Sequence, residues 1–322
     1  MSNGSELGEF LRVRRAALQP EDVGLRNYGV RRVPGLRREE LAMLAGVSNT
    51  YYTRLEQGLG TNASEAVIEA IARALNLNRD ERLHLFNLAR PVTKRKRRAA
   101  SRPDRARTGT VRLIDSMAST PAVVLGRRSE VLAWNSLGHR LVAGHLAFDS
   151  PTDPVERPNM TKMLFMDEHT RALYVNWAEE AARAVSSLRL LAGAASNDQE
   201  LTALVGELTM KSPEFAKLWA KHPVQNCMAG KKMMHHPEVG TLELNFEVLA
   251  QPDDSGHRIL MYTADAGSPA AAALLLLATT PDPATPTIKN TASFPVNRSA
   301  NAVAADFSSD RAAGPCKYIF LN

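Results

Sequence analysis

The side chains best suited to recognition chemistry gather in residues 48–57, where Asn49, Thr50 and Arg54 are expected at the exposed start of a helix. An asparagine amide can bond to N6 and N7 of adenine, and an arginine can bond to O6 and N7 of guanine or to a phosphate. Tyr51 could contact a thymine methyl group or a phosphate, although packing in a core is an equally good interpretation. Ser48 has the side chain of a helix cap, and its hydroxyl could also reach a phosphate. These residues predict a surface that reads nucleic-acid bases.

Arginines that could bind phosphate lie just before this segment, at Arg31, Arg32, Arg37 and Arg38. We interpret them as phosphate or minor-groove contacts that set the register on DNA. A solvated loop is the alternative, because surface arginines are common. The basic run Lys94–Arg98 has the same two interpretations.

The charge of the chain is divided unevenly. The net charge is +6, but residues 1–107 hold 21 Lys+Arg against 12 Asp+Glu, whereas the remaining residues hold 19 against 22. A basic front on a mildly acidic body is typical of contact with a polyanion. A GC-rich genome could explain the excess of arginine over lysine in the front, but not the uneven charge.

The composition excludes several classes of protein. A hydrophobic content of 44% is ample for a core and excludes global disorder. The longest apolar run, Ala270–Ala278, is far shorter than the roughly 20 residues of a membrane span, so no membrane contact is expected. The chain begins without the pattern of a secretory signal. Cys227 and Cys316 are isolated and are expected to be free thiols in a reducing cytoplasm.

Neither a common catalytic motif nor a convincing metal site is found in the sequence. His235, His236 and Glu238 look like metal ligands, but adjacent residues of a strand point to opposite faces of the sheet. We therefore interpret the stretch HPEVG as a turn between two strands. No metal, other cofactor or enzymatic activity is expected.

The elements that position Asn49 and Arg54 are two short helices separated by a tight turn. Ala42 is small where the helices would cross, Gly46 allows the turn, Val47 fills the gap and Leu55 anchors the second helix. This spacing predicts a helix-turn-helix, with an ordinary helical hairpin as the alternative. Periodicity predicts five helices in residues 1–90, with the fourth beginning at Ser64 and the fifth at about residues 79–89. Tyr52 is expected in the core, and Glu56 as a structural partner.

The sequence resembles a known family over about residues 5–280. Residues 36–58, LRREELAMLAGVSNTYYTRLEQG, resemble the Xre (Cro/C1-type) helix-turn-helix. Together with LGEFLRVRRAALQPEDVGL before them, they resemble the MmyB-like regulators. The resemblance implies a lambda-repressor-like DNA-binding domain, whose recognition helix runs from about Ser48 to Gln57. It also implies a PAS-like domain that binds a small apolar or amphipathic, fatty-acid-like effector.

The body, residues 108–280, mixes helical and strand patterns. We predict strands at residues 122–125, 130–134, 231–235, 241–250 and 258–264, with a hairpin at GRRS, and one long helix over residues 168–192. The expected arrangement is a twisted antiparallel sheet with helices on one side, an α+β body. Aromatic residues from several of these elements could line a pocket, although for each of them a plain aromatic core is the more common arrangement: Trp134, Phe165, Trp177, Trp219, Phe246 and Tyr262.

The expected architecture is therefore multidomain. An all-α helix-turn-helix domain in residues 1–90 is followed by a basic linker in 91–107, an α+β PAS-like domain in 108–280 and a disordered tail in 281–322. We expect a cytoplasmic, nucleoid-associated homodimer that binds double-stranded DNA and regulates transcription in response to an effector. The alternatives are a protein-interaction module of the antitoxin or anti-sigma type, or an enzyme tethered to DNA.

Overall fold

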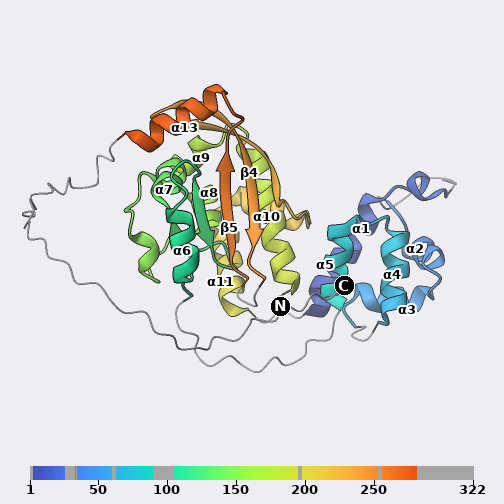
Figure 1. Ribbon diagram of the computed structural model, residues 1–322. Coiled ribbons are helices and arrows are strands. Elements are labelled where there is room, and N and C mark those ends of the chain that lie inside the picture. Colours follow the sequence, from blue (N-terminus) through green and yellow to red (C-terminus); the bar gives the residue numbers. More distant parts are fainter. Residues whose placement is uncertain are drawn as a thin grey trace, which may run out of the picture. The chain divides into compact units, whose positions relative to one another are not determined.

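Five α-helices form a bundle in the first part of the chain (Figure 1). The computed structural model describes residues 3–25, 33, 35–59, 63–89, 104–194, 198–252 and 256–280. The bundle consists of α1 (Asn3–Ala17), a 3-10 turn η1 (Pro20–Val23), α2 (Arg38–Leu44), α3 (Asn49–Glu56), α4 (Glu65–Ala74) and α5 (Arg79–Ala89). The helices follow the predicted order, and the fifth has the predicted bounds.

The turn between α2 and α3 has the predicted helix-turn-helix construction. Gly46 takes a positive φ of 66°, which an L side chain rarely adopts. Ala42 and Leu55 are buried, and Val47 packs against the same core. The hydroxyl of Ser48 accepts a hydrogen bond from the backbone N–H of Tyr51 at 3.2 Å, so Ser48 caps α3 as expected.

The body is built on one five-stranded antiparallel sheet, in the order β2-β1-β5-β4-β3. The strands are β1 (Ala122–Leu125), β2 (Val131–Trp134), β3 (Ala229–His236), β4 (Gly240–Ala250) and β5 (Arg258–Thr263). The segments GRRS and HPEVG connect neighbouring strands, as predicted. Phe246 of β4 lies opposite Tyr262 of β5 in the register.

The helices of the body differ from the prediction at one point. They are α6 (Thr108–Asp115), α7 (Ser136–Ala143), α8 (Met160–Met166), α9 (Glu168–Leu173), α10 (Trp177–Ala194), α11 (Gln199–Lys211), α12 (Pro213–Ala220) and α13 (Pro269–Thr279), with a 3-10 turn η2 (Ser150–Thr152). The predicted long helix over residues 168–192 is wrong, because the chain breaks between α9 and α10. Tyr174 forms a β-bridge with Met234 there, and the backbone N–H of Val175 donates to Met233 at 3.1 Å. Pairing with the edge of the sheet has replaced helical hydrogen bonds.

Helices cover both faces of the sheet at one end, whereas the sequence predicted them on one side. Val123 of β1 belongs to the large core shared with α7, α8, α10 and α11. The next residue, Val124, faces the other way and packs with Ile114 of α6 and Ile259 of β5 in a separate cluster. The strand AVVL is buried on both faces, so its lack of alternation is the signal for a second covered face.

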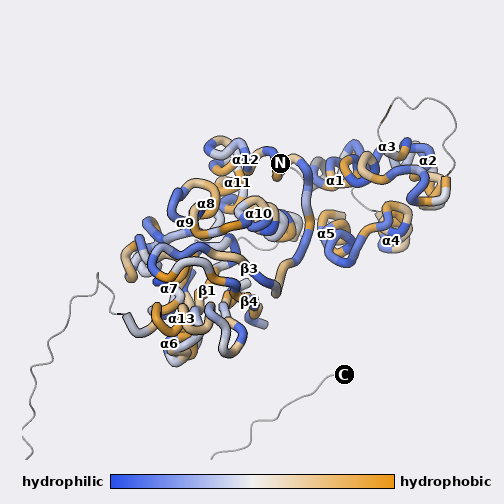
Figure 2. The backbone as a smooth tube through the Cα atoms, turned by 90° about the horizontal axis from the view of Figure 1, so that it is seen from above, coloured by the Kyte–Doolittle hydropathy of each residue, from blue (hydrophilic) through white to orange (hydrophobic). Residues whose placement is uncertain are grey.

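Helix α13 is apolar along most of its length (Figure 2). Leu274 and Leu277 pack into the large core, whereas Leu275 and Leu276 are exposed. Among the described residues, neither α13 nor another helix is both long and apolar enough to cross a membrane.

Residues 1–280 form one compact unit, so the bundle and the body share contacts. The expectations for the tail, residues 281–322, and for most of the basic linker, residues 91–103, fall outside the described residues.

Candidate functional site

Helix α3 presents polar side chains on one face and anchors itself through the other. Asn49, Thr50 and Arg54 are exposed, whereas Tyr52 and Leu55 are fully buried in the bundle. The exposed side chains stand in the first two turns of a capped helix, and this is the part of a recognition helix that meets base edges in the major groove. The arrangement therefore permits the base contacts predicted from the sequence, and those contacts remain predictions.

Tyr51 occupies an intermediate position. Its side chain is half-buried and packs against the edge of the bundle core, next to the exposed residues of α3. A half-buried tyrosine can pack through its ring and still offer its hydroxyl to a phosphate. Both interpretations of Tyr51 therefore stay open.

A buried carboxylate fixes α3 against α1. Glu56, at the end of α3, has a side chain that is 2% exposed. It accepts hydrogen bonds from Nε and Nη2 of Arg15 at 3.1 and 2.8 Å and from Arg38 at 3.2 Å. Burial raises the pKa of Glu56, but the bonds from Arg15 and Arg38 outweigh it and leave the pKa below its ordinary value. Glu56 is thus a structural partner, as predicted.

Two of the predicted phosphate-binding arginines can be placed. Arg37 is exposed, lies at the N-terminus of α2 and approaches Glu39 at 3.6 Å. Arg38 is exposed in part and shares Glu56 with Arg15, so its Nη2 group already has an acceptor. The contacts of both with DNA remain predictions. Arg31, Arg32 and the run at residues 94–98 lie outside the described residues.

Three of the six aromatic residues proposed for an effector pocket meet in one aromatic cluster of the body. Phe165 contacts Trp177 and Phe215 edge to face, at centroid distances of 5.6 and 5.2 Å. Trp219 stacks on Phe215 at 5.6 Å, and the guanidinium of Arg189 lies 3.7 Å above the Trp219 ring. These rings pack on one another, which is the arrangement of an aromatic core.

The other three lie elsewhere. Trp134 is buried at the far end of the sheet, where its Nε1 donates to the carbonyl of Phe148 at 2.8 Å. Phe246 and Tyr262 lie opposite each other on β4 and β5, beneath the side chain of Lys232. The six residues are therefore not brought together around one space, and their role in binding an effector stays a prediction.

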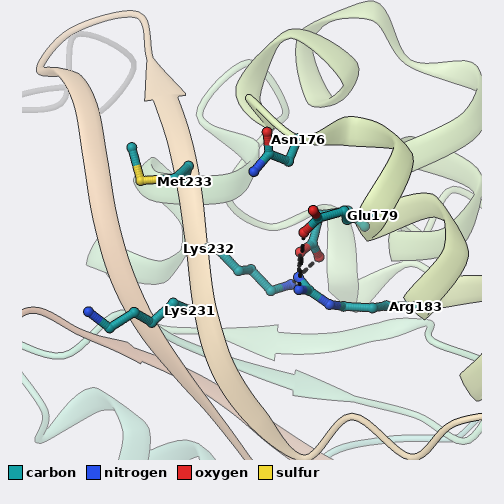
Figure 3. A pocket seen from close by; sticks show the side chains of 7 residues that line it. Asn176, Glu179, Arg183, Lys231, Lys232 and Met233 are labelled. Atoms are coloured by element: carbon teal, nitrogen blue, oxygen red, sulfur yellow. Dashed lines mark hydrogen bonds and ion pairs between the residues drawn. The ribbon is translucent and has the colours of Figure 1, made fainter.

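A small charged cavity of about 160 Å³ opens between α10 and β3 (Figure 3). Lys232 extends from β3 toward the acidic and basic side chains of α10, while Lys231 points away. The lining residues are Asn176, Glu179, Glu180, Arg183, Lys231, Lys232 and Met233. None of the six aromatic residues lines this cavity.

Lys232 is the residue that joins this cavity to the aromatic residues of the sheet. Its side chain is 11% exposed, and its ammonium lies 2.7 Å from a carboxylate oxygen of Glu180. The same ammonium stands 5.4, 4.6 and 5.9 Å from the ring centroids of Tyr174, Phe246 and Tyr262. The ammonium of Lys232 is therefore a charged group that lies against aromatic rings and is paired with one buried carboxylate. Glu180 also bonds to Arg183.

Lys232 is not among the site residues predicted from the sequence, although the pattern of β3 indicates its orientation. In β3 the buried residues Met234 and His236 alternate, and Lys232 is two positions before Met234 on the same face. The period of two therefore turns this lysine toward the interior. The expected opposite orientation of His235 and His236 is confirmed, because His236 is buried and bonds to the carbonyl of Arg140, whereas His235 is exposed beside Thr241.

Helix α10 contacts the bundle with the end that lies away from the cavity. Leu190 packs on the core of the bundle, and Gly193 faces the ring of His84 in α5. A Cβ atom at position 193 would lie only 2.5 Å from that ring. The first turns of α10 supply Glu179, Glu180 and Arg183 to the cavity, so one rigid helix reaches both places.

The segment between α12 and β3 makes a second contact with the bundle. Val224 is buried in the bundle core. The carbonyl of His222 accepts a hydrogen bond from Arg14 at 2.9 Å, and the backbone N–H of Asn226 donates to Asp80 at 2.8 Å. This segment leads directly into β3, the strand that carries Lys231 and Lys232.

Comparison with known families matches both parts of the chain. Residues 106–277, more than half of the chain, match the MmyB-like transcription regulator ligand binding domain. Residues 6–85 match a helix-turn-helix domain. A comparison with curated proteins gave no match. Residues 6–85 correspond to the bundle and contain α3, and residues 106–277 correspond to the body.

Proposed function

Because this chain belongs to the family of regulators with an MmyB-like ligand-binding domain, here behind a helix-turn-helix domain, we propose that α3 reads a specific operator and that a small amphipathic effector controls this reading. The observation that carries the first part is the polarity of α3. Asn49, Thr50 and Arg54 are exposed above the buried residues Tyr52 and Leu55, and this combination suits insertion into a major groove.

The direct test is to recover the genomic DNA that the full chain binds, and then to measure its affinity for the recovered sequence and for random DNA. We expect specific binding at least about 10³-fold tighter than random binding. If four to six cations meet phosphates, the logarithm of the affinity should fall with the logarithm of salt concentration at a slope of about −4 to −5. Equal affinity for both DNAs, together with a co-purifying protein, would instead support a protein-interaction module.

We propose that the regulator acts as a homodimer. Helix-turn-helix dimers bind half-sites about 10 base pairs apart, or a multiple of that, because each recognition helix must enter the same side of the duplex. A recovered operator with two inverted half-sites at this spacing, and two chains per duplex in native mass spectrometry, would support the dimer. One isolated half-site bound by one chain would contradict it.

A fatty-acid-like effector would place its anionic head group in the cavity beside Lys232. A carboxylate could replace Glu180 as the partner of Lys232, while Glu180 kept its bond to Arg183. The rings of Tyr174, Phe246 and Tyr262 next to the ammonium offer an apolar surface to an acyl chain. Such an exchange keeps every buried charge paired, which a low-polarity site requires.

The size of the cavity implies that effector binding moves α10. About 160 Å³ is well below the roughly 300–1,000 Å³ of typical ligand pockets, so a head group fits but an acyl chain does not. The acyl chain must therefore separate α10 from β3. Helix α10 also contacts the bundle, at Leu190 and Gly193. We therefore propose that the effector changes operator affinity by shifting α10 against α5.

The matching experiment measures operator affinity with dodecanoate and with the neutral dodecanol. A change of affinity with dodecanoate alone supports an anionic amphipathic effector. The same response to both compounds, or to neither, contradicts it. Operator binding without any effector is measured in the same titration, so failure of the effector proposal is distinguished from failure of DNA recognition.

A further inference from the structure

We propose that His145, Asp167 and His169 form a binding site for a divalent transition metal on the surface of the body. One ligand atom from each of these residues lies within 4.8 Å of the others. The site is separate from α3 and from the cavity beside Lys232. These three residues were not predicted from the sequence to form a site.

Two segments of the chain, the loop after α7 and the start of α9, bring the ligands together. His145 follows the end of α7, Asp167 stands between α8 and α9, and His169 lies in the first turn of α9. Nε2 of His145 is 2.8 Å from one oxygen of Asp167, and Nδ1 of His169 is 3.9 Å from the other. The two imidazole rings are stacked at a centroid distance of 4.6 Å, with an interplanar angle of 9°.

Asp167 is held rigidly at the centre of the group. One of its oxygens accepts the backbone N–H of Thr170 at 2.9 Å, so the carboxylate caps α9 while the other oxygen faces His145. A preorganised carboxylate between two imidazoles lowers the cost of assembling a site, because only the histidines must adjust. His169 can adjust easily, since its side chain is 74% exposed.

The ligand types indicate the class of metal. Two imidazole nitrogens with one carboxylate oxygen suit Zn²⁺, Co²⁺ or Ni²⁺ better than Mg²⁺ or Ca²⁺, which prefer oxygen ligands. Ligand atoms of a tetrahedral zinc stand about 3.3 Å apart, given bonds of about 2.0–2.1 Å. Rotation of the exposed His169 ring out of the stack closes the remaining gap. Because the site is open to solvent, water would complete the coordination.

The effect of the metal would be local. It would tie the loop after α7 to the start of α9, and α9 ends three residues before Asn176, which lines the cavity. Metal binding would therefore stabilise the same segment that leads into α10.

The test is calorimetric titration of the untagged full chain with Zn²⁺. We expect one equivalent to bind, and an affinity reduced by at least about tenfold in His169→Ala and in Asp167→Asn, since even outer-sphere changes cost that much. The second variant keeps the helix cap but removes the charge. The first should leave the fold intact, because the His169 side chain is exposed. His235→Ala, which removes an exposed histidine of β3, should leave binding unchanged. The absence of saturable binding, undiminished binding in His169→Ala, or loss in His235→Ala would each overturn the proposal.

Discussion

Arg15 of α1 and Glu56 of α3 form a two-point ion pair inside the bundle, with nitrogen–oxygen distances of 3.1 and 2.8 Å. Glu56 is the last residue of α3, the helix that presents Asn49 and Arg54. Gly8 of α1 allows this proximity, because a Cβ atom there would stand 2.2 Å from the carbonyl oxygen of Glu56. The orientation of the recognition surface thus depends on a buried pair that does not itself face DNA.

Replacement of Glu56 should therefore weaken both the fold and DNA binding. Glu56→Ala leaves the guanidinium of Arg15, 10% exposed, without its carboxylate, and loss of one partner of a buried pair costs about 3–5 kcal/mol. Arg15 keeps its bond to the carbonyl of Leu36 at 2.6 Å, so we expect the lower end of this range in urea unfolding. Glu39→Ala, in an exposed acid of α2, should change stability by less than about 0.5 kcal/mol. Equal stability of the two variants would contradict this account.

Arg54→Ala should reduce affinity for the operator by about 1–3 kcal/mol if the guanidinium binds a guanine edge. The loss on random DNA should be much smaller, because a base contact contributes only to the specific complex. Arg112→Ala removes a positive charge from another exposed arginine, in α6 of the body, and controls for net charge. Equal losses on operator and random DNA would identify Arg54 as a phosphate contact instead.

Lys232→Met should abolish the preference for an anionic effector. Methionine fills the space above Phe246 and Tyr262 without an ammonium, and a hydrogen bond to a charged group contributes about 1.5–3 kcal/mol. Dodecanoate should therefore bind about tenfold more weakly or worse in a calorimetric titration. Lys211→Met, at an exposed lysine of α11, is the matched control. Unchanged binding of dodecanoate to Lys232→Met would remove this lysine from the effector site.

The contact between α10 and α5 can be tested with two glycines. Gly193→Ala places a methyl group 2.5 Å from the buried His84 ring, so we expect a loss of about 1–3 kcal/mol from overpacking. Gly206→Ala, in α11, meets nothing within 4 Å and should stabilise the protein by up to about 1 kcal/mol through helix propensity. Opposite signs in thermal or urea unfolding support a tight contact at Gly193. Stabilisation by both substitutions would mean that the His84 ring moves aside without loss of stability.

The elements that the sequence predicted best are those with strong local signals. Ser48, Gly46 and the period of Tyr52 and Leu55 define α3, because caps, turns and apolar faces are set within a few residues. The break at Tyr174 could not be predicted in this way, since it depends on pairing with Met234, 60 positions later. Lys232 was likewise missed, because its ion pair with Glu180 joins distant segments and only the alternation of β3 hinted at it.

The His84 ring makes the interface between bundle and body sensitive to acid. Burial, with smaller contributions from Arg189, His222 and Arg14, lowers the pKa of His84 to about 3, from 6.5 in an unfolded chain. Between these two values the unfolded state binds one more proton than the folded state, so the free energy of unfolding must fall as the pH falls. From pH 7 to pH 5 this group alone should remove about 2 kcal/mol from the free energy of unfolding, because each pH unit below 6.5 is worth about 1.4 kcal/mol.

Urea unfolding at the two pH values measures this loss of stability. His84→Leu should reduce the loss by that amount, whereas His235→Leu, at an exposed histidine, should not. A variant lacking His84 that loses as much stability as the wild-type chain would show that another group carries the acid sensitivity.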